Sequence, residues 1–462
     1  MSGLFGIVAT GDCTEKLFYG TDYHSHLGTE VAGLAVLGEY FQHRIHSLTN
    51  SQFKSRFAEE ITKMSGHSGI GVISDSNTQP FVVSSRVGDF ALVTAGLITN
   101  VDRLAHELLT TGHSFAEVAR GRINPTELVA KIISSGKNLT DGIKKVYEKV
   151  EGSISMLVLT REGILAARDA RGRLPLVVGS GVGAWAIASE TCSFPNLGFT
   201  AEKYIGPGEI VKITAEGMEV LSPAHEGTQI CAFLWIYTGY PASKYEGITV
   251  ESVRERCGQL LAKKDTIKAD FATGIPDSGV GHAIGYAMES RLPYRRPLVK
   301  YTPGYGRSYT PASQEVRDLV AKMKLIPIRD IIEGQRIVIC DDSIVRGTQL
   351  RNLTIQKLWD NGAKEVHLRA ACPPLMYPCR YAVSTRSEKE LAARRAIRDL
   401  EGEAVKNVAA YCNPKSREYA EMVEWIRRDL NVTSLAYLDA DEMIQAIGLP
   451  AEKLCTYCWL GE

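Results

Sequence analysis

The segment at residues 336–348, RIVICDDSIVRGT, limits the possible folds of this chain more than any other feature. An apolar strand ends at two adjacent acids, Asp341 and Asp342, and a turn containing Ser, Gly and Thr leads into a predicted helix over residues 350–361. A second apolar strand follows at residues 365–371. A strand, a tight loop, a helix and another strand are typical of a parallel sheet, whose ligands gather at the carboxyl ends of the strands. The segment therefore predicts an α/β domain with a binding site at this loop.

The residue types in this loop suit a sugar phosphate. Carboxylates such as those of Asp341 and Asp342 accept hydrogen bonds from the two adjacent hydroxyls of a ribose. Residues 343–348 present consecutive backbone N–H groups and two hydroxyls at the start of a helix, which is a site for a phosphate monoester. An isolated D-D-S is usually only an acidic turn with a helix cap. Because an apolar strand precedes the D-D-S here, a site for ribose 5-phosphate is favoured.

The charge balance and the apolar runs exclude several classes of partner. The chain has 53 Lys and Arg against 53 Asp and Glu, so no net charge draws it onto nucleic acid or an anionic membrane. Its longest apolar runs, such as residues 153–160, are far shorter than the roughly 20 residues of a membrane helix. The start, MSGLFGIVAT, lacks the basic and apolar regions of a signal peptide, so a cytoplasmic protein with no nucleic-acid or membrane partner is expected.

Two domains are expected, because single hydrophobic cores stop growing at about 250–300 residues and this chain has 462. Residues 1–225 combine short β-type runs with helical stretches, one of them opened by Asn124 as an N-cap before Pro125, which indicates helices on mostly antiparallel sheets. Residues 226–462 alternate strands and helices. The predicted elements are strands at 4–9, 33–37, 69–73, 91–94, 155–159, 176–179, 184–188, 269–274, 298–300, 336–340 and 365–371, and helices at 106–120, 125–147 and 350–361.

Residues 336–348 resemble the phosphoribosyl pyrophosphate motif of type I phosphoribosyltransferases. The sequence DDSIVRGT is similar to that motif in the amidophosphoribosyltransferases of purine synthesis. The stretch GIPDS at residues 274–278 resembles the loop of this family that holds the diphosphate. The resemblance implies phosphoribosyl pyrophosphate as substrate, with Mg²⁺ bound through Asp341, Asp342 and Ser278. The implied substrate-binding residues are Pro276, Asp277, Ser278, Asp341, Asp342, Ser343, Val345, Arg346, Gly347 and Thr348.

The stretch KYTPGYGRSYTP at residues 300–311 resembles the flexible catalytic loop of the family, which usually reads K-N-R-Y-x-G-R-T-F. The resemblance implies Lys300 and Arg307 as catalytic cations, which would stabilise the charge that develops on the leaving diphosphate. The stretch departs from the family at Tyr301 and Thr302, where Asn and Arg are usual, and has one inserted residue. Two basic positions beyond the loop also match: Arg317 and Lys324.

The N-terminal half resembles the glutaminase domain of the same family at residues 168–179, 188–190 and 206–209. That domain has an N-terminal-nucleophile-hydrolase fold, an αββα sandwich. The resemblance implies this sandwich over residues 1–225 and a type I phosphoribosyltransferase domain with a parallel sheet over residues 226–462, with a cluster-binding C-terminal tail.

The residues with which this family hydrolyses glutamine are replaced here. The family begins with a Cys whose free α-amine is the base for its own thiol, whereas this chain has Ser2, and a hydroxyl is far less ionised than a thiol. Ala95 replaces the Asn of the oxyanion hole, a loss worth about 3 kcal/mol of transition-state stabilisation at comparable sites. The resemblance therefore implies a degenerate glutaminase, in which Ser2 acts only if that activity survives. The family's Arg, His, Arg and Asp are likewise replaced, by Leu27, Val72, Ser74 and Pro125.

Four of the ten cysteines fall where the iron–sulfur subclass of this family places its thiolate ligands. They are Cys231, Cys379, Cys455 and Cys458, the last two forming a C-x-x-C. Four thiolates hold a [4Fe–4S] cluster or a tetrahedral zinc ion, and spacing alone does not choose between them. The family resemblance favours the cluster.

The resemblance implies a homo-oligomeric phosphoribosyltransferase that displaces pyrophosphate from phosphoribosyl pyrophosphate with ammonia or another amine, its glutaminase function lost. Two alternatives remain open: a non-catalytic phosphoribosyl pyrophosphate or nucleotide sensor that regulates a partner, and a glutamine-dependent enzyme that uses Ser2. Residues 393–419 form an extra charged, helix-prone segment relative to the family, expected to be a solvated helix rather than a partner contact.

Overall fold

The computed structural model of the protein describes residues 2–49, 51–75, 77–116, 118–119, 121–301, 323–382, 387–402 and 407–461. The chain divides into two compact units. The sequence predicts one boundary, after residue 225, whereas the units change at Cys231 and the first unit also takes two short later segments. The first unit comprises Met1–Cys231, Ser243–Gly247 and Arg380–Ser384, and the second comprises Ala232–Ala242, Ile248–Cys379 and Thr385–Glu462.

Two antiparallel sheets form the centre of the first unit. Buried apolar side chains from both sheets, among them Leu4, Val72, Val93 and Leu157, pack between them. The seven-stranded sheet has the order β13-β11-β12-β1-β4-β2-β3 and the six-stranded sheet the order β15-β14-β10-β9-β6-β5. The strands of the first sheet are β1 (Gly3–Ala9), β2 (Val31–Leu37), β3 (Phe41–Ser47), β4 (Ser68–Ser74), β11 (Val177–Gly181), β12 (Ala184–Ala188) and β13 (Thr200–Tyr204). Those of the second are β5 (Phe81–Ser85), β6 (Gly88–Ile98), β9 (Gly152–Thr160), β10 (Gly163–Ala167), β14 (Ile210–Ile213) and β15 (Met218–Ser222).

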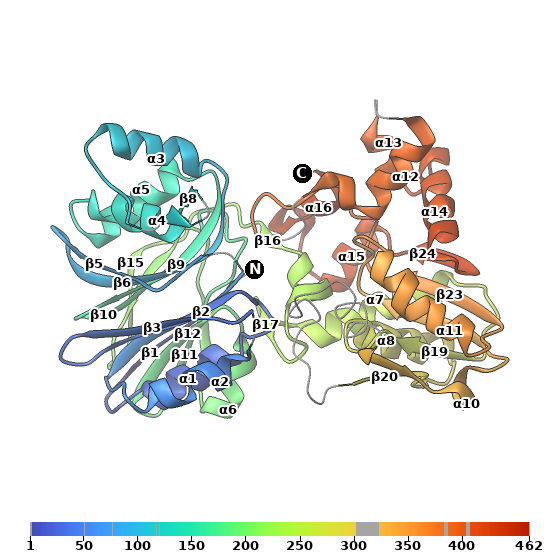
Figure 1. Ribbon diagram of the computed structural model, residues 1–462, viewed down its shortest axis with the longest axis horizontal. Helices are drawn as coiled ribbons and strands as arrows, with labels where there is room; N and C mark the ends of the chain where they lie inside the picture. Colours follow the sequence, from blue (N-terminus) through green and yellow to red (C-terminus); the bar gives the residue numbers. More distant parts are fainter. Residues whose placement is uncertain are drawn as a thin grey trace. The chain divides into compact units, whose positions relative to one another are not determined.

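Helices cover the outer face of each sheet, so the first unit has four layers (Figure 1). One outer core, which includes Phe5, Leu17 and Phe57, lies between the seven-stranded sheet and its helices. The other, which includes Leu92, Leu128 and Ile132, lies under the helices of the six-stranded sheet. This arrangement confirms the predicted αββα sandwich. The covering helices are α1 (Thr14–Asp22), α2 (Phe53–Ile61) and α6 (Phe194–Leu197) on one side and α3 (Val101–Thr110), α4 (Pro125–Ser134) and α5 (Leu139–Lys149) on the other.

The two helices predicted in this unit differ from those observed. The helix predicted over residues 106–120 is α3, which ends at Thr110 because the chain turns at Gly112, whose φ is +86°. The helix predicted over residues 125–147 is divided into α4 and α5, because Asn138 caps a new helix by accepting a hydrogen bond from the Asp141 N–H. The predicted Asn124 cap is confirmed.

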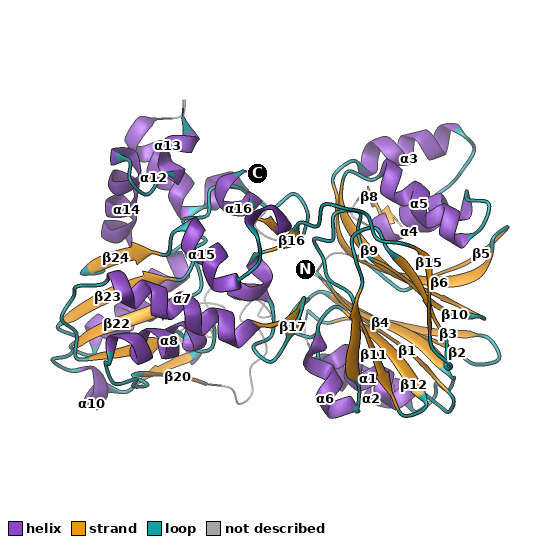
Figure 2. Cartoon of the chain, turned by 180° about the vertical axis from the view of Figure 1, so that it is seen from behind, coloured by secondary structure: helices purple, strands orange, loops and turns teal. Residues whose placement is uncertain are grey.

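A four-stranded parallel sheet with the order β19-β22-β23-β24 forms the centre of the second unit (Figure 2). Helix α11 lies in front of this sheet in Figure 1, and α7 and α8 lie in front of it in the opposite view of Figure 2, so they cover opposite faces. The strands are β19 (Phe271–Gly274), β22 (Arg336–Asp341), β23 (Glu365–Ala370) and β24 (Ser434–Tyr437). The helices include α7 (Val250–Lys264), α8 (Val280–Ser290), α10 (Arg329–Ile332), α11 (Gln356–Asp360), α12 (Ala392–Glu401), α13 (Val408–Cys412), α14 (Arg417–Leu430), α15 (Ala440–Ile447) and α16 (Tyr457–Leu460).

Three of the four strands predicted in this unit are members of the parallel sheet. The fourth, β20 (Leu298–Lys300), instead pairs antiparallel with β21 (Leu325–Pro327), and Pro297 directly before it has no N–H with which to extend a ladder. The helix predicted over residues 350–361 begins as a wider π-helical turn, η3 (Leu350–Ile355), before α11.

The segment expected as a solvated helix is packed against the core of the second unit. Helix α12 places Ala393, Ala396 and Ile397 in the same buried cluster as Ile337 and Leu368 of the sheet. The expectation was wrong because its apolar residues recur at helical spacing and form a buried stripe along the charged helix. No helix in the described residues is long and apolar enough to cross a membrane.

A glycine in β2 permits a close backbone approach in the first unit. A Cβ at Gly33 would lie 2.0 Å from the carbonyl oxygen of Gln79, whereas a Cβ at the exposed Gly11 would meet nothing within 4 Å. We predict that Gly33→Ala lowers the free energy of unfolding by about 1–3 kcal/mol, because the neighbouring backbone must move. Gly11→Ala is the control and should change it by less than about 0.5 kcal/mol. Thermal unfolding followed by circular dichroism measures both, and equal midpoints for the two variants would contradict the packing described.

Candidate functional site

Two adjacent carboxylates lie at the carboxyl end of β22. Asp341 is the last residue of that strand, and the two side chains are only 9% and 3% exposed. The Ser278 hydroxyl donates to Asp341 Oδ1 at 2.8 Å, and the Asp342 N–H donates to the same oxygen at 3.0 Å. The Ser343 hydroxyl donates to Asp342 Oδ1 at 2.5 Å. The structure therefore brings together four of the residues that the sequence predicts for the site.

Burial dominates the electrostatics of these two acids. It raises the pKa of Asp341 to about 6, against hydrogen bonds from Ser278 and the Asp342 N–H, and it raises the pKa of Asp342 further, helped by the charge of Asp341. Adjacent buried carboxylates of this kind gain most from hydroxyl donors or a cation. The arrangement is suited to binding a diol, a divalent cation or both.

The loop after β19 reaches the acids through close backbone contacts. The Ile275 N–H donates to the Cys340 carbonyl at 3.0 Å, and a Cβ on Gly279 would lie 2.0 Å from that carbonyl oxygen. Only glycine fits there, and this close approach puts Ser278 within hydrogen-bonding distance of Asp341. Pro276 is partly buried and Asp277 is exposed, and a cis peptide bond joins the two.

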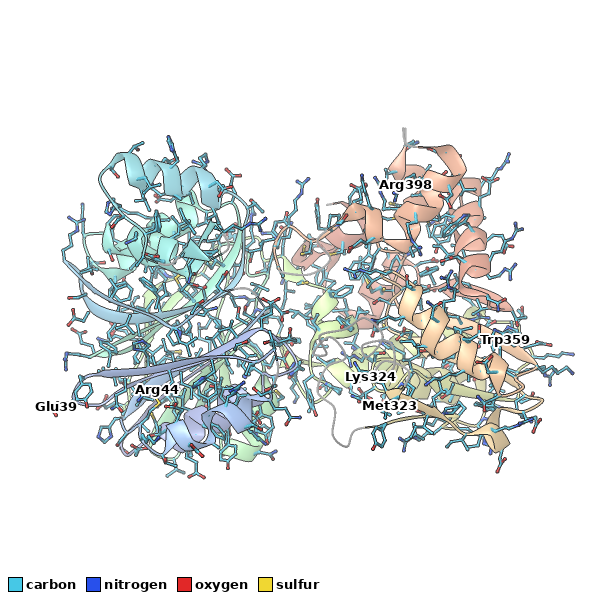
Figure 3. All side chains as sticks on the ribbon, in the orientation of Figure 1. Glu39, Arg44, Met323, Lys324, Trp359 and Arg398 are labelled. Atoms are coloured by element: carbon cyan, nitrogen blue, oxygen red, sulfur yellow. The ribbon has the colours of Figure 1, made fainter. Side chains whose placement is uncertain are left out.

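One of the two predicted catalytic cations lies beside this loop. Lys300 Nζ forms an ion pair with Asp277 Oδ2 at 2.8 Å, and both side chains are largely exposed. The other, Arg307, lies outside the described residues, as do Thr302 and Arg317. The described chain resumes at Met323 and Lys324, both labelled in Figure 3, and the Tyr301 N–H donates to the Lys324 carbonyl at 2.8 Å.

The loop between Ser343 and Thr348 has the backbone of an anion site. Gly347 is buried and has a left-handed φ of +74°, and Thr348 begins the helical turn that continues into η3. In the part of the chain that the structure describes, the N–H groups of Arg346, Gly347 and Thr348 donate to no other group. Successive free N–H groups before a helix form a concavity that binds phosphate. Val345 is partly buried behind them and Arg346 is exposed.

The residues that replace the family's glutaminase residues in the first unit carry no charged side chains. The Ser2 hydroxyl donates to Ser74 Oγ at 3.0 Å, and Ser74, Val72 and Ala95 are buried at the ends or interior of β4 and β6. Pro125 is the first residue of α4 and has no polar group in its side chain. These positions offer neither a cation for a carboxylate nor an anion for an ammonium group.

The structure also contains a buried acid that the sequence did not single out. Glu190 is 1% exposed and accepts hydrogen bonds from His26 Nε2 at 3.0 Å and from the Ser243 hydroxyl at 2.7 Å. Burial by itself raises its pKa, but the charge and hydrogen bond of His26 outweigh it and the pKa falls to about 2. The only sequence signal was the short stretch at residues 188–190, one of three that resemble the glutaminase domain of the family.

Comparisons with known proteins agree with this geometry. Residues 67–196 match the family model described as "Glutamine amidotransferase domain". An amidophosphoribosyltransferase of Methanocaldococcus jannaschii is 32% identical over 100% of this chain and 97% of its own length. The chain belongs to the amidophosphoribosyltransferase family.

This family places the protein among the pentosyltransferases, a class of glycosyltransferases. The amidophosphoribosyltransferase of Bacillus subtilis is 30% identical over 100% of this chain and 93% of its own length. A solved structure described as glutamine phosphoribosylpyrophosphate amidotransferase from B. subtilis, complexed with ADP and GMP, has a TM-score of 0.85 and 29% identity. It covers 100% of this chain and 96% of its own, which confirms the fold class of both units.

Three of the cysteines predicted as cluster ligands, Cys379, Cys455 and Cys458, belong to the second unit, and Cys231 is the last residue of the first segment of the first unit. The Ala232 N–H, directly after Cys231, donates to the Cys455 carbonyl at 3.2 Å. The Met376 and Tyr377 N–H groups, near Cys379, donate to the Cys458 carbonyl at 2.9 and 3.0 Å. No group of three or more His, Cys, Asp or Glu arranged to hold a metal ion occurs among the described residues, and the cluster stays a prediction.

Removing one buried acid should stabilise the protein. A carboxyl whose pKa is raised on folding costs stability above its folded-state pKa, and the cost disappears once both states are protonated. We predict that Asp342→Asn raises the thermal midpoint by about 2–5 °C at pH 7.5, and that the gain shrinks as the pH falls through the raised pKa of Asp342 and is lost near the ordinary aspartate pKa of about 4.

The control for this prediction is Asp270→Asn in the same unit. Hydrogen bonds from Arg336, whose Nη2 lies 2.8 Å from Asp270 Oδ1, lower the pKa of Asp270 to about 2. This variant should therefore lower the midpoint at pH 7.5. A lower midpoint for Asp342→Asn as well would contradict the assignment of an unfavourable buried charge.

Proposed function

We propose that this chain transfers a phosphoribosyl group from phosphoribosyl pyrophosphate to ammonia or another small amine without hydrolysing glutamine. The observation that carries the proposal is the buried pair Asp341 and Asp342, held beside Ser278 and followed by a loop of free N–H groups. Acids for the diol and amides for the phosphate are the two halves of a ribose 5-phosphate site. The names of the relatives, amidophosphoribosyltransferases, support the same substrate.

The residues of the second unit divide the work of the reaction. Asp341 and Asp342 accept hydrogen bonds from the ribose hydroxyls. The N–H groups of Arg346 and Gly347 donate hydrogen bonds to the 5-phosphate. Lys300 stabilises the charge on the pyrophosphate as the bond from C1 to its oxygen breaks. The amine nitrogen attacks C1 from the opposite face, so the configuration inverts, and the nitrogen then loses a proton to solvent.

The carboxylates and hydroxyl at this site also fit Mg²⁺. Asp341, Asp342 and Ser278 offer the hard oxygen ligands that this ion takes. Bound there with the substrate, Mg²⁺ would neutralise charge on the departing diphosphate.

The first unit supports loss of the glutaminase function. Ser2 is the only group at the family's nucleophile position, and its hydroxyl is hydrogen-bonded to Ser74, which stands where the family has the Arg that holds the glutamine carboxylate. Ala95 and Pro125 offer no donor for an oxyanion and no acceptor for an ammonium group. We infer that this unit serves the enzyme as a folded scaffold, and that the nitrogen comes from solution or from a partner.

Pyrophosphate release tests the proposal directly. Protein purified without oxygen receives phosphoribosyl pyrophosphate and Mg²⁺, with glutamine in one reaction and ammonium at alkaline pH in another. We expect release with ammonium and none with glutamine. Asp341→Asn should lower the ammonium rate at least about 100-fold, because it removes an acceptor of the ribose diol, whereas Ser2→Ala should leave that rate unchanged.

Each other result assigns a different function. Release with glutamine that Ser2→Ala abolishes would establish a glutamine-dependent enzyme and contradict the proposal. Release in neither reaction, together with tight binding of phosphoribosyl pyrophosphate, would establish the sensor.

We further propose that Cys231, Cys379, Cys455 and Cys458 hold a [4Fe–4S] cluster with a structural role. The Cys455 carbonyl accepts a hydrogen bond from the residue after Cys231, and the Cys458 carbonyl accepts from two residues just before Cys379. These contacts between the segments that carry the cysteines support the proposal. Four thiolates at such a site would fix the C-terminal tail, residues 454–461, to the segments that carry Cys231 and Cys379.

The cluster is tested by its spectrum and composition. Anaerobically purified protein should show broad absorption near 400 nm and about four iron and four sulfide per chain. Cys458→Ser should abolish both signals, whereas Cys412→Ser should keep them, because the Cys412 thiol donates to the Val408 carbonyl on α13. One zinc ion per chain and no iron in the wild-type protein would contradict the cluster.

A further inference from the structure

The phosphate loop is fastened to a helix that the proposed reaction does not use. The Ala392 N–H donates to the Val345 carbonyl at 2.8 Å, and Arg395 Nη2 donates to the Arg346 carbonyl at 2.9 Å. Both donors belong to α12, and both acceptors belong to the loop. Two successive carbonyls of the loop are therefore held by one helix.

These two contacts fix the direction of the N–H groups in the loop. In a trans peptide the carbonyl of one residue and the N–H of the next point in opposite directions. Because the carbonyls of Val345 and Arg346 face α12, the N–H groups of Arg346 and Gly347 face away from it. With Gly347 in the left-handed region, the backbone has the geometry in which successive N–H groups can bind one anion.

The Arg395 side chain is itself held in place. Its Nη2 forms an ion pair with Asp429 Oδ2 at 3.1 Å, and Asp429 Oδ1 accepts from Arg351 Nη1 at 2.8 Å. The Arg351 N–H donates back to the Gly347 carbonyl at 2.9 Å, which closes a ring of contacts around the loop. The guanidinium also lies over the Trp425 ring, 5.8 Å from its centroid. Arg395 is thus a fixed support and not a free surface cation.

We propose that Arg395 is a positioning residue for the 5-phosphate: it holds the Arg346 carbonyl so that the N–H groups of Arg346 and Gly347 are presented to the ligand. The inference rests on the proposed function, because it assumes that this loop binds the phosphate of a ribose 5-phosphate. Arg395 acts through the backbone, so its loss should weaken binding of the phosphate and leave binding of the diphosphate unchanged.

Titration calorimetry of the full chain tests this inference with ribose 5-phosphate and, separately, with pyrophosphate and Mg²⁺. We expect Arg395→Ala to weaken the binding of ribose 5-phosphate about tenfold, roughly 1.4 kcal/mol. The affinity for pyrophosphate should stay within about twofold of the wild-type value. The control is Arg398→Ala on the same helix (Figure 3), whose side chain donates to the Lys389 carbonyl at 3.2 Å. It removes the same charge and should change neither affinity more than about twofold.

The ionic strength separates positioning from charge attraction. A loss caused by backbone positioning persists at about 0.5 M salt, whereas a loss caused by the charge of Arg395 fades there, because exposed charges are screened. A loss that fades, or equal affinities for Arg395→Ala and Arg398→Ala, would overturn the inference and leave the proposed function standing. Failure of the wild-type protein to bind ribose 5-phosphate would overturn both.

A second variant tests the inference if the circular dichroism spectrum shows that Arg395→Ala does not fold. Asp429→Asn keeps the size of the side chain and removes the charge that orients Arg395 and Arg351. We expect ribose 5-phosphate to bind about threefold more weakly to this variant, with pyrophosphate unchanged. An affinity equal to that of the wild-type protein would overturn the inference.

Discussion

Two neighbouring carboxylates at the end of a buried strand are the feature on which the second unit depends. Asp341 and Asp342 are held out of water, and burial raises the pKa of both. Such a pair destabilises the fold and gains its compensation from the ligands it attracts. The surrounding structure is arranged around this pair: the glycine loop after β19 brings Ser278 to Asp341, and β20 ends with Lys300 beside the exposed part of that loop.

Both units have the fold of the family, and the proposed function uses the site of the second unit alone. The first unit has both sheets and, among its described residues, apolar cores between the sheets and under the helices on either side. At the positions that the family uses for glutamine hydrolysis it has Ser2, Ser74 and Ala95, none of which carries a charge. A hydrophobic core is maintained by the stability of the fold, whereas a charged pocket that no longer binds its ligand only costs stability. Under the proposed loss of glutamine hydrolysis, this contrast explains how the whole unit can remain folded without its chemistry.

Much of the architecture could be predicted from the sequence because local signals were strong. The strand before Asp341, the apolar runs of the sandwich and the Asn124 cap all appeared where predicted. The division between α4 and α5 has a local cause, the Asn138 cap, which the continuous apolar spacing of residues 125–147 obscured. The pairing of β20 with β21 could not be predicted, because it depends on contacts between residues distant in the chain. The same holds at the site. The loop and its acids were evident, but the support from Arg395 and the ion pair of Glu190 join residues 49 and 164 positions apart.

The central claim is that the second unit joins an amine to ribose 5-phosphate without the first unit hydrolysing glutamine. A single isotope measurement tests it: phosphoribosyl pyrophosphate, Mg²⁺, ¹⁵N-ammonium and unlabelled glutamine are mixed in one reaction, and the mass of the product is determined after rapid quenching. The account predicts a phosphoribosylamine that carries only ¹⁵N. A product carrying ¹⁴N, with glutamate released in equal amount, would contradict it.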